Sequence, residues 1–143
     1  MAIRPGTANR RRALFEEAAE IIEREYPKDL ELDDVARRLA TSRRQLQRAF
    51  AEAGATTFRT HVAYVRMRNA LDLLNEGSLP VREVAARVGY RQAAQFAKTF
   101  RRHHGRPPST FRGAGRRRAG GAHAASARAR YSARTPDSAH ARA

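Results

Sequence analysis

Apolar residues recur along this chain every three or four positions, in segments separated by short polar links. Such spacing places the apolar side chains on one side of a helix. The segments cover residues 11–25, 32–39, 42–54, 58–75, 79–88 and 91–104. The pattern predicts an all-α fold whose amphipathic helices pack through their apolar faces.

The segment 42–54 separates an apolar face from a polar one. Leu46, Ala49 and Phe50 form one apolar stripe, while Ser42 is placed to cap the helix and Gly54 to end it. The outward residues are Arg43, Arg44, Gln47 and Arg48. Arginine and glutamine can make paired hydrogen bonds to guanine and adenine edges. An arginine-rich face is more commonly just a solvated one. The neighbouring segments therefore determine whether this face is interpreted as contacting DNA.

The preceding segment, 32–39, completes a helix-turn-helix pattern. Val35 and Ala36 face inward, and the small Ala36 lets the following helix approach closely. The link at 40–41 is short, although Ala40 stands where such a turn often has glycine.

The pattern returns later in the chain. Val84 and Ala85 correspond to the earlier Val-Ala pair, Gly89 occupies the turn, and the segment 91–104 follows as a second recognition-type helix. Between the two patterns lies the segment 58–75. About eighteen helical residues at ~1.5 Å rise each span roughly 27 Å, which is long enough to hold two units apart. The repeat predicts two helix-turn-helix units joined by a long linker helix.

The charge of the chain indicates a polyanionic partner. Among 143 residues, 29 are Lys or Arg and 14 are Asp or Glu, for a net charge of +15. This balance points to DNA, RNA or an acidic membrane surface. The sequence has no apolar leader and no apolar run long enough to span a membrane, which predicts a cytoplasmic protein without a membrane partner.

Candidate catalytic and metal-binding residues are few. The chain has no cysteine, which excludes a disulfide, a thiolate zinc site and the cysteine chemistry of alkyltransferase enzymes fused to DNA-binding domains. The adjacent His103 and His104 point to different sides of a helix, and Asp33 and Asp34 are ordinary first-turn acids. We therefore predict no enzyme activity, no metal and no cofactor.

The composition divides the chain into three parts. Residues 1–9 are predicted to be a flexible arm, because Pro5 and Gly6 discourage regular structure. Residues 10–112 form the folded part, in which Pro108 starts a short helix and Phe111 packs on the second unit. Residues 113–143 are rich in Gly, Ala, Arg and Ser and are predicted to be a disordered basic tail.

The second pattern resembles a known family. It reads VREVAARVGY at 81–90 and QFAKTFRRHHGRPPSTFR at 95–112. The signature positions are Ala85, Gly89, Tyr90, Phe96, Phe100, Gly105, Pro108 and Arg112, with Arg66, Ala70, Leu73 and Leu74 fitting the linker helix. Over roughly residues 10–112 the chain resembles the AraC/XylS-type DNA-binding domain, most closely its minimal MarA/SoxS-like members.

The resemblance implies a two-lobed, homeodomain-like fold that binds double-stranded DNA as a monomer. Each recognition helix would enter one of two successive major grooves, ~34 Å apart. By position, the implied base-reading residues are Arg44, Gln47, Arg48, Ala93, Ala94, Gln95 and Lys98. The residues expected at phosphates or in positioning are Ser42, Arg43, Gln92, Arg101 and Arg102. A transcription regulator in the nucleoid that contacts RNA polymerase is the function this family implies.

The second helix departs from the family pattern. Ala93 and Ala94 stand where many members have longer polar side chains, and Arg91 and Gln92 replace the usual cap. We expect the first helix to carry most of the base discrimination. Two alternatives stay open: a low-specificity nucleoid-associated binder driven by charge, and the DNA-binding fragment of a longer ligand-sensing regulator.

Overall fold

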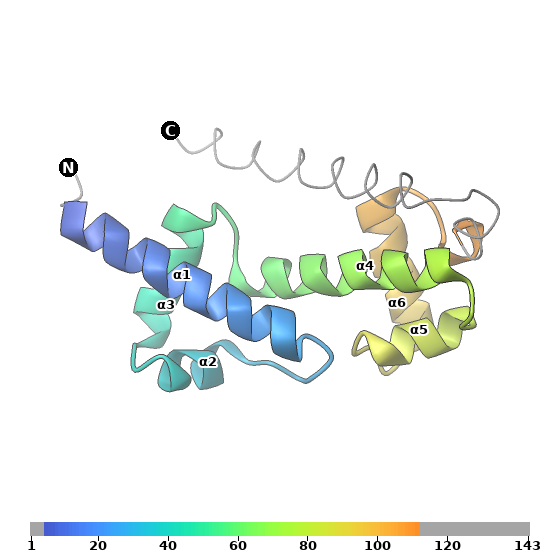
Figure 1. Cartoon of the computed structure of the whole chain (residues 1–143), viewed down its shortest axis with the longest axis horizontal. Helices are drawn as coiled ribbons and strands as arrows, with labels where there is room; N and C mark the ends of the chain where they lie inside the picture. Colours follow the sequence, from blue (N-terminus) through green and yellow to red (C-terminus); the bar gives the residue numbers. More distant parts are fainter. Residues whose placement is uncertain (1–4, 112–143) are drawn as a thin grey trace. The chain divides into compact units, whose positions relative to one another are not determined.

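A computed structural model describes residues 5–111 of the chain, and Figure 1 shows their helices. The α-helices are α1 (Pro5–Glu25), α2 (Leu32–Arg38), α3 (Arg43–Ala53), α4 (Phe58–Glu76), α5 (Val81–Arg87) and α6 (Ala93–His104), followed by the 3-10 helix η1 (Pro108–Thr110). No strand occurs in these described residues, and the all-α prediction is confirmed. The predicted tail at 113–143 and the signature residue Arg112 lie outside the described residues.

The predicted flexible arm is wrong for residues 5–9, since α1 begins at Pro5. A proline has no N–H, and the first N–H groups of a helix have no intrahelical acceptor, so the first helical position tolerates proline well. Nothing lies within 4 Å of a Cβ built on Gly6. The remainder of the predicted arm, residues 1–4, lies outside the described residues.

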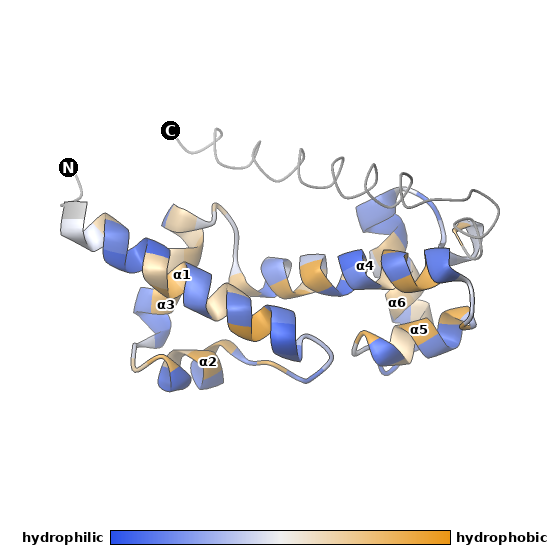
Figure 2. Cartoon of the chain, in the orientation of Figure 1, coloured by the Kyte–Doolittle hydropathy of each residue, from blue (hydrophilic) through white to orange (hydrophobic). Residues whose placement is uncertain are grey.

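The described residues divide into two compact units. The first runs to Ala63 and the second starts at Tyr64, so that α4 contributes to both. The buried residues of the first unit are Ala18, Ile21, Ile22, Val35, Ala36, Leu46, Ala49, Phe50, Phe58 and Val62. Those of the second are Val65, Met67, Ala70, Leu71, Leu74, Val84, Ala85, Val88, Phe96, Phe100 and Pro108. Figure 2 shows apolar and polar residues alternating along the helices of each unit, as expected where one face of each helix is buried.

Aromatic side chains hold α1 against α3 in the first unit. The Phe15 ring of α1 lies edge-on to Phe50 of α3, with centroids 5.1 Å apart, and 5.6 Å from His61. Phe50 in turn lies 5.7 Å from Phe58 at the start of α4. The Phe15 ring also covers Gly54, where a built Cβ would lie 2.7 Å from Cζ and 2.9 Å from Cδ1. The glycine therefore ends α3 and also makes room for this ring.

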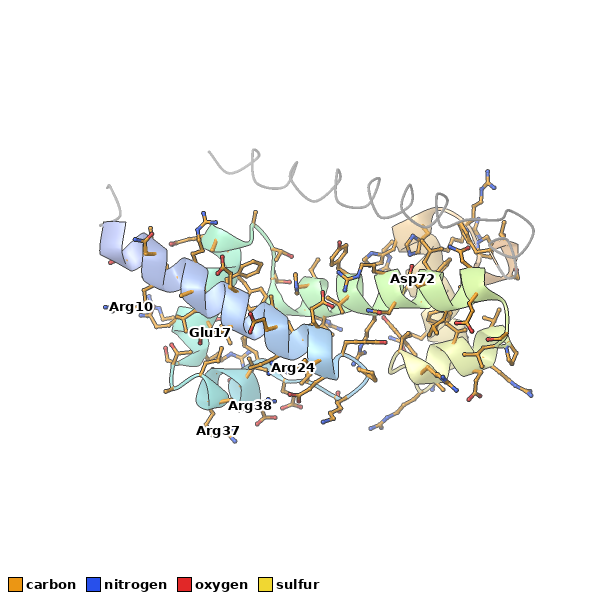
Figure 3. The ribbon with its side chains drawn as sticks, viewed as in Figure 1. Arg10, Glu17, Arg24, Arg37, Arg38 and Asp72 are labelled. Atoms are coloured by element: carbon orange, nitrogen blue, oxygen red, sulfur yellow. The ribbon has the colours of Figure 1, made fainter. Side chains whose placement is uncertain are left out.

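An ion pair joins α1 to α2. Arg38 of α2 donates from Nη1 and Nη2 to the two carboxylate oxygens of Glu25, at 2.9 and 2.6 Å. These bonds lower the pKa of Glu25 and raise that of Arg38. Figure 3 labels Arg38 together with Arg24, the neighbour of Glu25 on α1. The pair fixes the end of α1 beside the first helix of the helix-turn-helix.

The second unit is closed by the residues that follow α6. The rings of Phe100 and Phe111 lie 5.6 Å apart, and those of Phe100 and His104 lie 4.4 Å apart. His104 also donates from Nε2 to the carbonyl oxygen of Met67 on α4, at 3.2 Å. The predicted short helix at Pro108 and the packing of Phe111 on this unit are confirmed.

Candidate nucleic-acid interface

The turn between α2 and α3 contains a residue, Ala40, with the left-handed backbone conformation. The Thr41 N–H donates to the Ala36 carbonyl at 2.9 Å, and the Ala40 N–H donates to the Arg37 carbonyl at 3.1 Å. These two bonds form a Schellman motif, which requires a positive φ at the residue after the cap. Ala40 has φ +53°, a conformation that costs an alanine ~1–2 kcal/mol and a glycine very little.

The turn between α5 and α6 repeats this hydrogen bonding. The Tyr90 N–H donates to the Ala85 carbonyl at 2.9 Å, and the Gly89 N–H donates to the Ala86 carbonyl at 3.1 Å. Gly89 has φ +102°. Glycine adopts the positive φ of this motif at little cost, whereas Ala40 adopts it with strain. The two helix-turn-helix patterns are thus built on the same backbone motif.

The two recognition helices begin differently. The Ser42 hydroxyl accepts a hydrogen bond from the Gln45 N–H at 3.1 Å, which confirms the predicted cap of α3. At the same position before α6, the side chain of Gln92 makes no capping hydrogen bond. The usual side-chain cap, whose replacement by Arg91 and Gln92 the sequence indicates, is thus missing at the start of the second recognition helix.

The turns also differ in length, and this fixes how the two helices correspond. Two residues lie between Leu39 and the cap Ser42, whereas three lie between Val88 and the cap Gln92. With the caps matched, the buried Leu46 and Phe50 of α3 correspond to the buried Phe96 and Phe100 of α6. Along the outward faces, Arg43 then corresponds to Ala93, Arg44 to Ala94, Gln45 to Gln95, Gln47 to Ala97 and Arg48 to Lys98.

All of the predicted DNA-contacting residues are exposed. They are Ser42, Arg43, Arg44, Gln47 and Arg48 of the first unit, and Gln92, Ala93, Ala94, Gln95, Lys98, Arg101 and Arg102 of the second. Within residues 5–111, Arg44, Gln47 and Arg48 make no hydrogen bond or ion pair, so their donors stay available to an external partner.

Arg43 has an internal partner that sequence reasoning missed. Its Nη1 lies 3.2 Å from both carboxylate oxygens of Asp33, in the first turn of α2. Both side chains are more than half exposed, so the pair is weak and can open in water. The arginine predicted to contact phosphate is therefore shared with a carboxylate of the same unit.

The other end of α3 carries a second missed ion pair. Arg11 of α1 donates from Nη1 to Oε2 of Glu52. The Arg11 side chain is only 12% exposed, and its Nε is buried without a hydrogen-bond partner among the described residues. Glu52 is the one acidic residue in the sequence of α3, a signal that could have prompted a search for its partner.

Charge is distributed unevenly between the two units. Residues 5–63 contain eleven Lys or Arg against ten Asp or Glu, for a net charge of +1. Residues 64–111 contain nine against three, for a net charge of +6. The unit whose recognition helix has the fewer hydrogen-bonding side chains at the matched positions (93–98 against 43–48) thus carries most of the positive charge of the described residues.

Within residues 5–111, no three His, Cys, Asp or Glu side chains gather closely enough to hold a metal ion. Burial, with smaller contributions from the neighbouring His104 and Arg102, lowers the pKa of His103 from 6.5 to about 4. None of the helices in this part of the chain is long and apolar enough to cross a membrane.

Comparisons with known proteins agree with this geometry. A family model described as a helix-turn-helix domain matches residues 35–114, more than half of the chain. A solved transcriptional regulator from Chromobacterium violaceum, titled as containing an AraC-type DNA-binding domain, superposes with a TM-score of 0.69 at 27% identity, covering 76% of this chain and 96% of that one. The C-terminal domain of AraT, a response regulator from Geobacillus stearothermophilus, superposes with a TM-score of 0.66 at 29% identity, covering 73% and 85%.

The curated relatives are longer proteins. The uncharacterized HTH-type transcriptional regulator YijO of Escherichia coli is 33% identical over 106 residues, which are 74% of this chain and 38% of YijO. The Msm operon regulatory protein of Streptococcus mutans is 29% identical over 101 residues, which are 71% of this chain and 36% of that protein. The chain therefore spans less than two fifths of the length of these relatives.

Proposed function

Because this chain belongs to the AraC-type helix-turn-helix family of DNA-binding transcription regulators, we propose that it recognises specific DNA sequences unequally with α3 and α6. In this proposal α3 reads bases, and the second unit holds the protein on the duplex. The observation that carries the proposal is the contrast between Arg44, Gln47 and Arg48 on α3 and their counterparts Ala94, Ala97 and Lys98 on α6.

The side chains of α3 suit base recognition. Arginine makes paired hydrogen bonds to guanine, and glutamine does so to adenine. On α6, alanine can only pack against a thymine methyl, so Lys98 is the one long donor among the three matched positions. Gln95 and its structural counterpart Gln45 add one exposed amide to each helix.

The charge of the second unit supports its role as an anchor. Contacts with phosphates release counterions and give affinity that hardly depends on sequence. Arg101 and Arg102, which follow Lys98 on α6, are exposed and suited to such contacts. Ser42, Arg43 and Gln92 are proposed to position the two helices at the backbone.

The proposal extends to the mode of action. The two helices occupy successive major grooves of double-stranded DNA, the protein binds as a monomer, and it acts on transcription by contacting RNA polymerase. It needs no cofactor or metal, carries out no enzymatic reaction, and works in the cytoplasm at the nucleoid. The family membership and the paired helix-turn-helix units support this mode of action. Because the curated relatives are longer, the alternative is that the chain acts as part of a longer ligand-sensing regulator.

The net charge of +15 favours a second candidate, a low-specificity DNA binder. Selection of binding sites from random DNA at physiological salt separates the two. A regulator enriches a defined motif, while a charge-driven binder enriches none and shows a steep salt dependence.

The test of unequal recognition compares two matched variants. Arg48→Ala should cost ~1–3 kcal/mol of binding free energy at the selected site and relax the preference at one base pair. Lys98→Ala, at the corresponding position of α6, should weaken binding to all sequences more evenly and lower the salt dependence. Unchanged sequence preference in Arg48→Ala would show that α3 does not read DNA as proposed.

A further inference from the structure

A carboxylate on α3 can compete with DNA for the Arg48 guanidinium. Glu52 lies four residues after Arg48, and residues four apart are neighbours on a helix surface. An arginine and a glutamate at this spacing attract one another, which would draw the Arg48 guanidinium along α3 toward the carboxylate. A carboxylate left unpaired at that place would also repel DNA phosphates.

In the structure, Glu52 is bound from the other side. Arg11 of α1 donates to its Oε2, and Arg48 makes no ion pair within the described residues. The Arg11 side chain is largely buried between the helices, which restricts it far more than an exposed arginine. One turn further along α1, the contact of Phe15 with Phe50 fixes this helix against α3.

The geometry points to Arg11 as a positioning residue for DNA recognition. It occupies and neutralises Glu52, and so keeps the Arg48 guanidinium available for a base. This inference rests on the proposed function, because it assigns Arg11 a role only if Arg48 reads DNA.

In the second unit, α6 has no acidic residue at the position that corresponds to Glu52. With the caps matched, Glu52 of α3 corresponds to Arg102 of α6, four residues after Lys98. No carboxylate stands beside Lys98 on α6, and no counterpart of Arg11 is needed there.

The experiment measures affinity for the selected DNA site in Arg11→Met, Glu52→Gln and the double variant. Methionine keeps much of the apolar volume of Arg11 but leaves Glu52 free. Arg11→Met should weaken specific binding about two- to fivefold, through Arg48–Glu52 pairing and repulsion of phosphate. The double variant should return to within about twofold of the original affinity, because glutamine neither holds Arg48 nor repels DNA. Arg24→Met, an exposed arginine at the far end of α1, is the matched control and should change little.

A purely structural role for Arg11 predicts a different outcome. In that case the double variant would bind as weakly as Arg11→Met, and the loss would follow the lowered unfolding temperature. The same substitution in an Arg48→Ala background separates the two proposals: Arg11→Met should then cause a smaller loss, limited to the repulsion of phosphate by the freed Glu52. An undiminished loss in that background would overturn the role of Arg11, while an Arg48→Ala variant with unchanged sequence preference would overturn the proposed function itself.

Discussion

The contact between Phe15 and Gly54 makes a sharp prediction for Gly54→Ala. Gly54 has φ −100°, a conformation open to every residue, so alanine meets no backbone strain there. What alanine meets is the Phe15 ring, since its Cβ would lie 2.7 Å from Cζ and 2.9 Å from Cδ1. The effect of the substitution is therefore one of packing alone.

The size of the effect follows from this geometry. Carbon atoms in contact prefer ~3.5–4.0 Å, and Cε1 is the ring atom nearest to the new Cβ, so the ring has to withdraw by more than ~1 Å. Withdrawal disturbs its contacts with Phe50 and His61, and overpacking of this kind costs ~1–3 kcal/mol. Replacing glycine by alanine at a compatible φ also raises the free energy of unfolding by ~0.4–1 kcal/mol, because alanine restricts the unfolded chain. We expect a net loss of about 1–2 kcal/mol in the free energy of unfolding.

Urea denaturation followed by circular dichroism measures this loss. Phe15→Leu shortens the ring that blocks the Cβ, so the double variant should be less destabilised than the sum of the single variants, by about 1 kcal/mol. Gly6→Ala is the matched control, because its Cβ meets nothing within 4 Å, and it should be neutral or stabilising. A Gly54→Ala protein as stable as the original, or strictly additive single effects, would refute the reasoning.

Three further predictions concern stability. Ala40→Gly should stabilise by up to ~1 kcal/mol and Gly89→Ala should destabilise by ~1 kcal/mol in thermal unfolding, because both residues have positive φ; opposite signs would contradict this. Ser42→Ala should cost ~0.5–2 kcal/mol, whereas Gln92→Ser should stabilise by supplying the missing cap of α6, as denaturant midpoints would show. Because the pKa of His103 is lowered from 6.5 to about 4, the unfolded chain binds a proton more readily than the folded one, so stability should fall as pH drops from 6.5 toward 4; His103→Gln should flatten that part of the unfolding profile.

Much of the fold follows from local sequence. The stripe of Leu46, Ala49 and Phe50 and the cap at Ser42 locate α3 because both depend on residues within a few positions of one another. The repeat of the Val-Ala pair locates α5 for the same reason. The start of α1 was mispredicted because Pro5 and Gly6 are breakers inside a helix but acceptable in its first turn.

The internal partners of the DNA-contacting residues could not be predicted in this way. Arg11 and Glu52 lie 41 positions apart and Asp33 and Arg43 lie ten apart, and no periodic pattern couples them. Their meeting depends on how α1 and α2 pack on α3, and contacts between distant segments, such as that of Phe15 with Phe50, hold α1 there.

The independence of Arg44, Gln47 and Arg48 from the rest of the molecule has an evolutionary consequence. Since these side chains make no hydrogen bond or ion pair in the described part of the chain, their replacement removes nothing that holds the helices together. After gene duplication, substitutions at these positions can therefore change the operator that the protein recognises without lowering its stability to the point of unfolding. Glu52 is different, because a change there alters its partner Arg11 as well, and the two positions are expected to vary together among descendants.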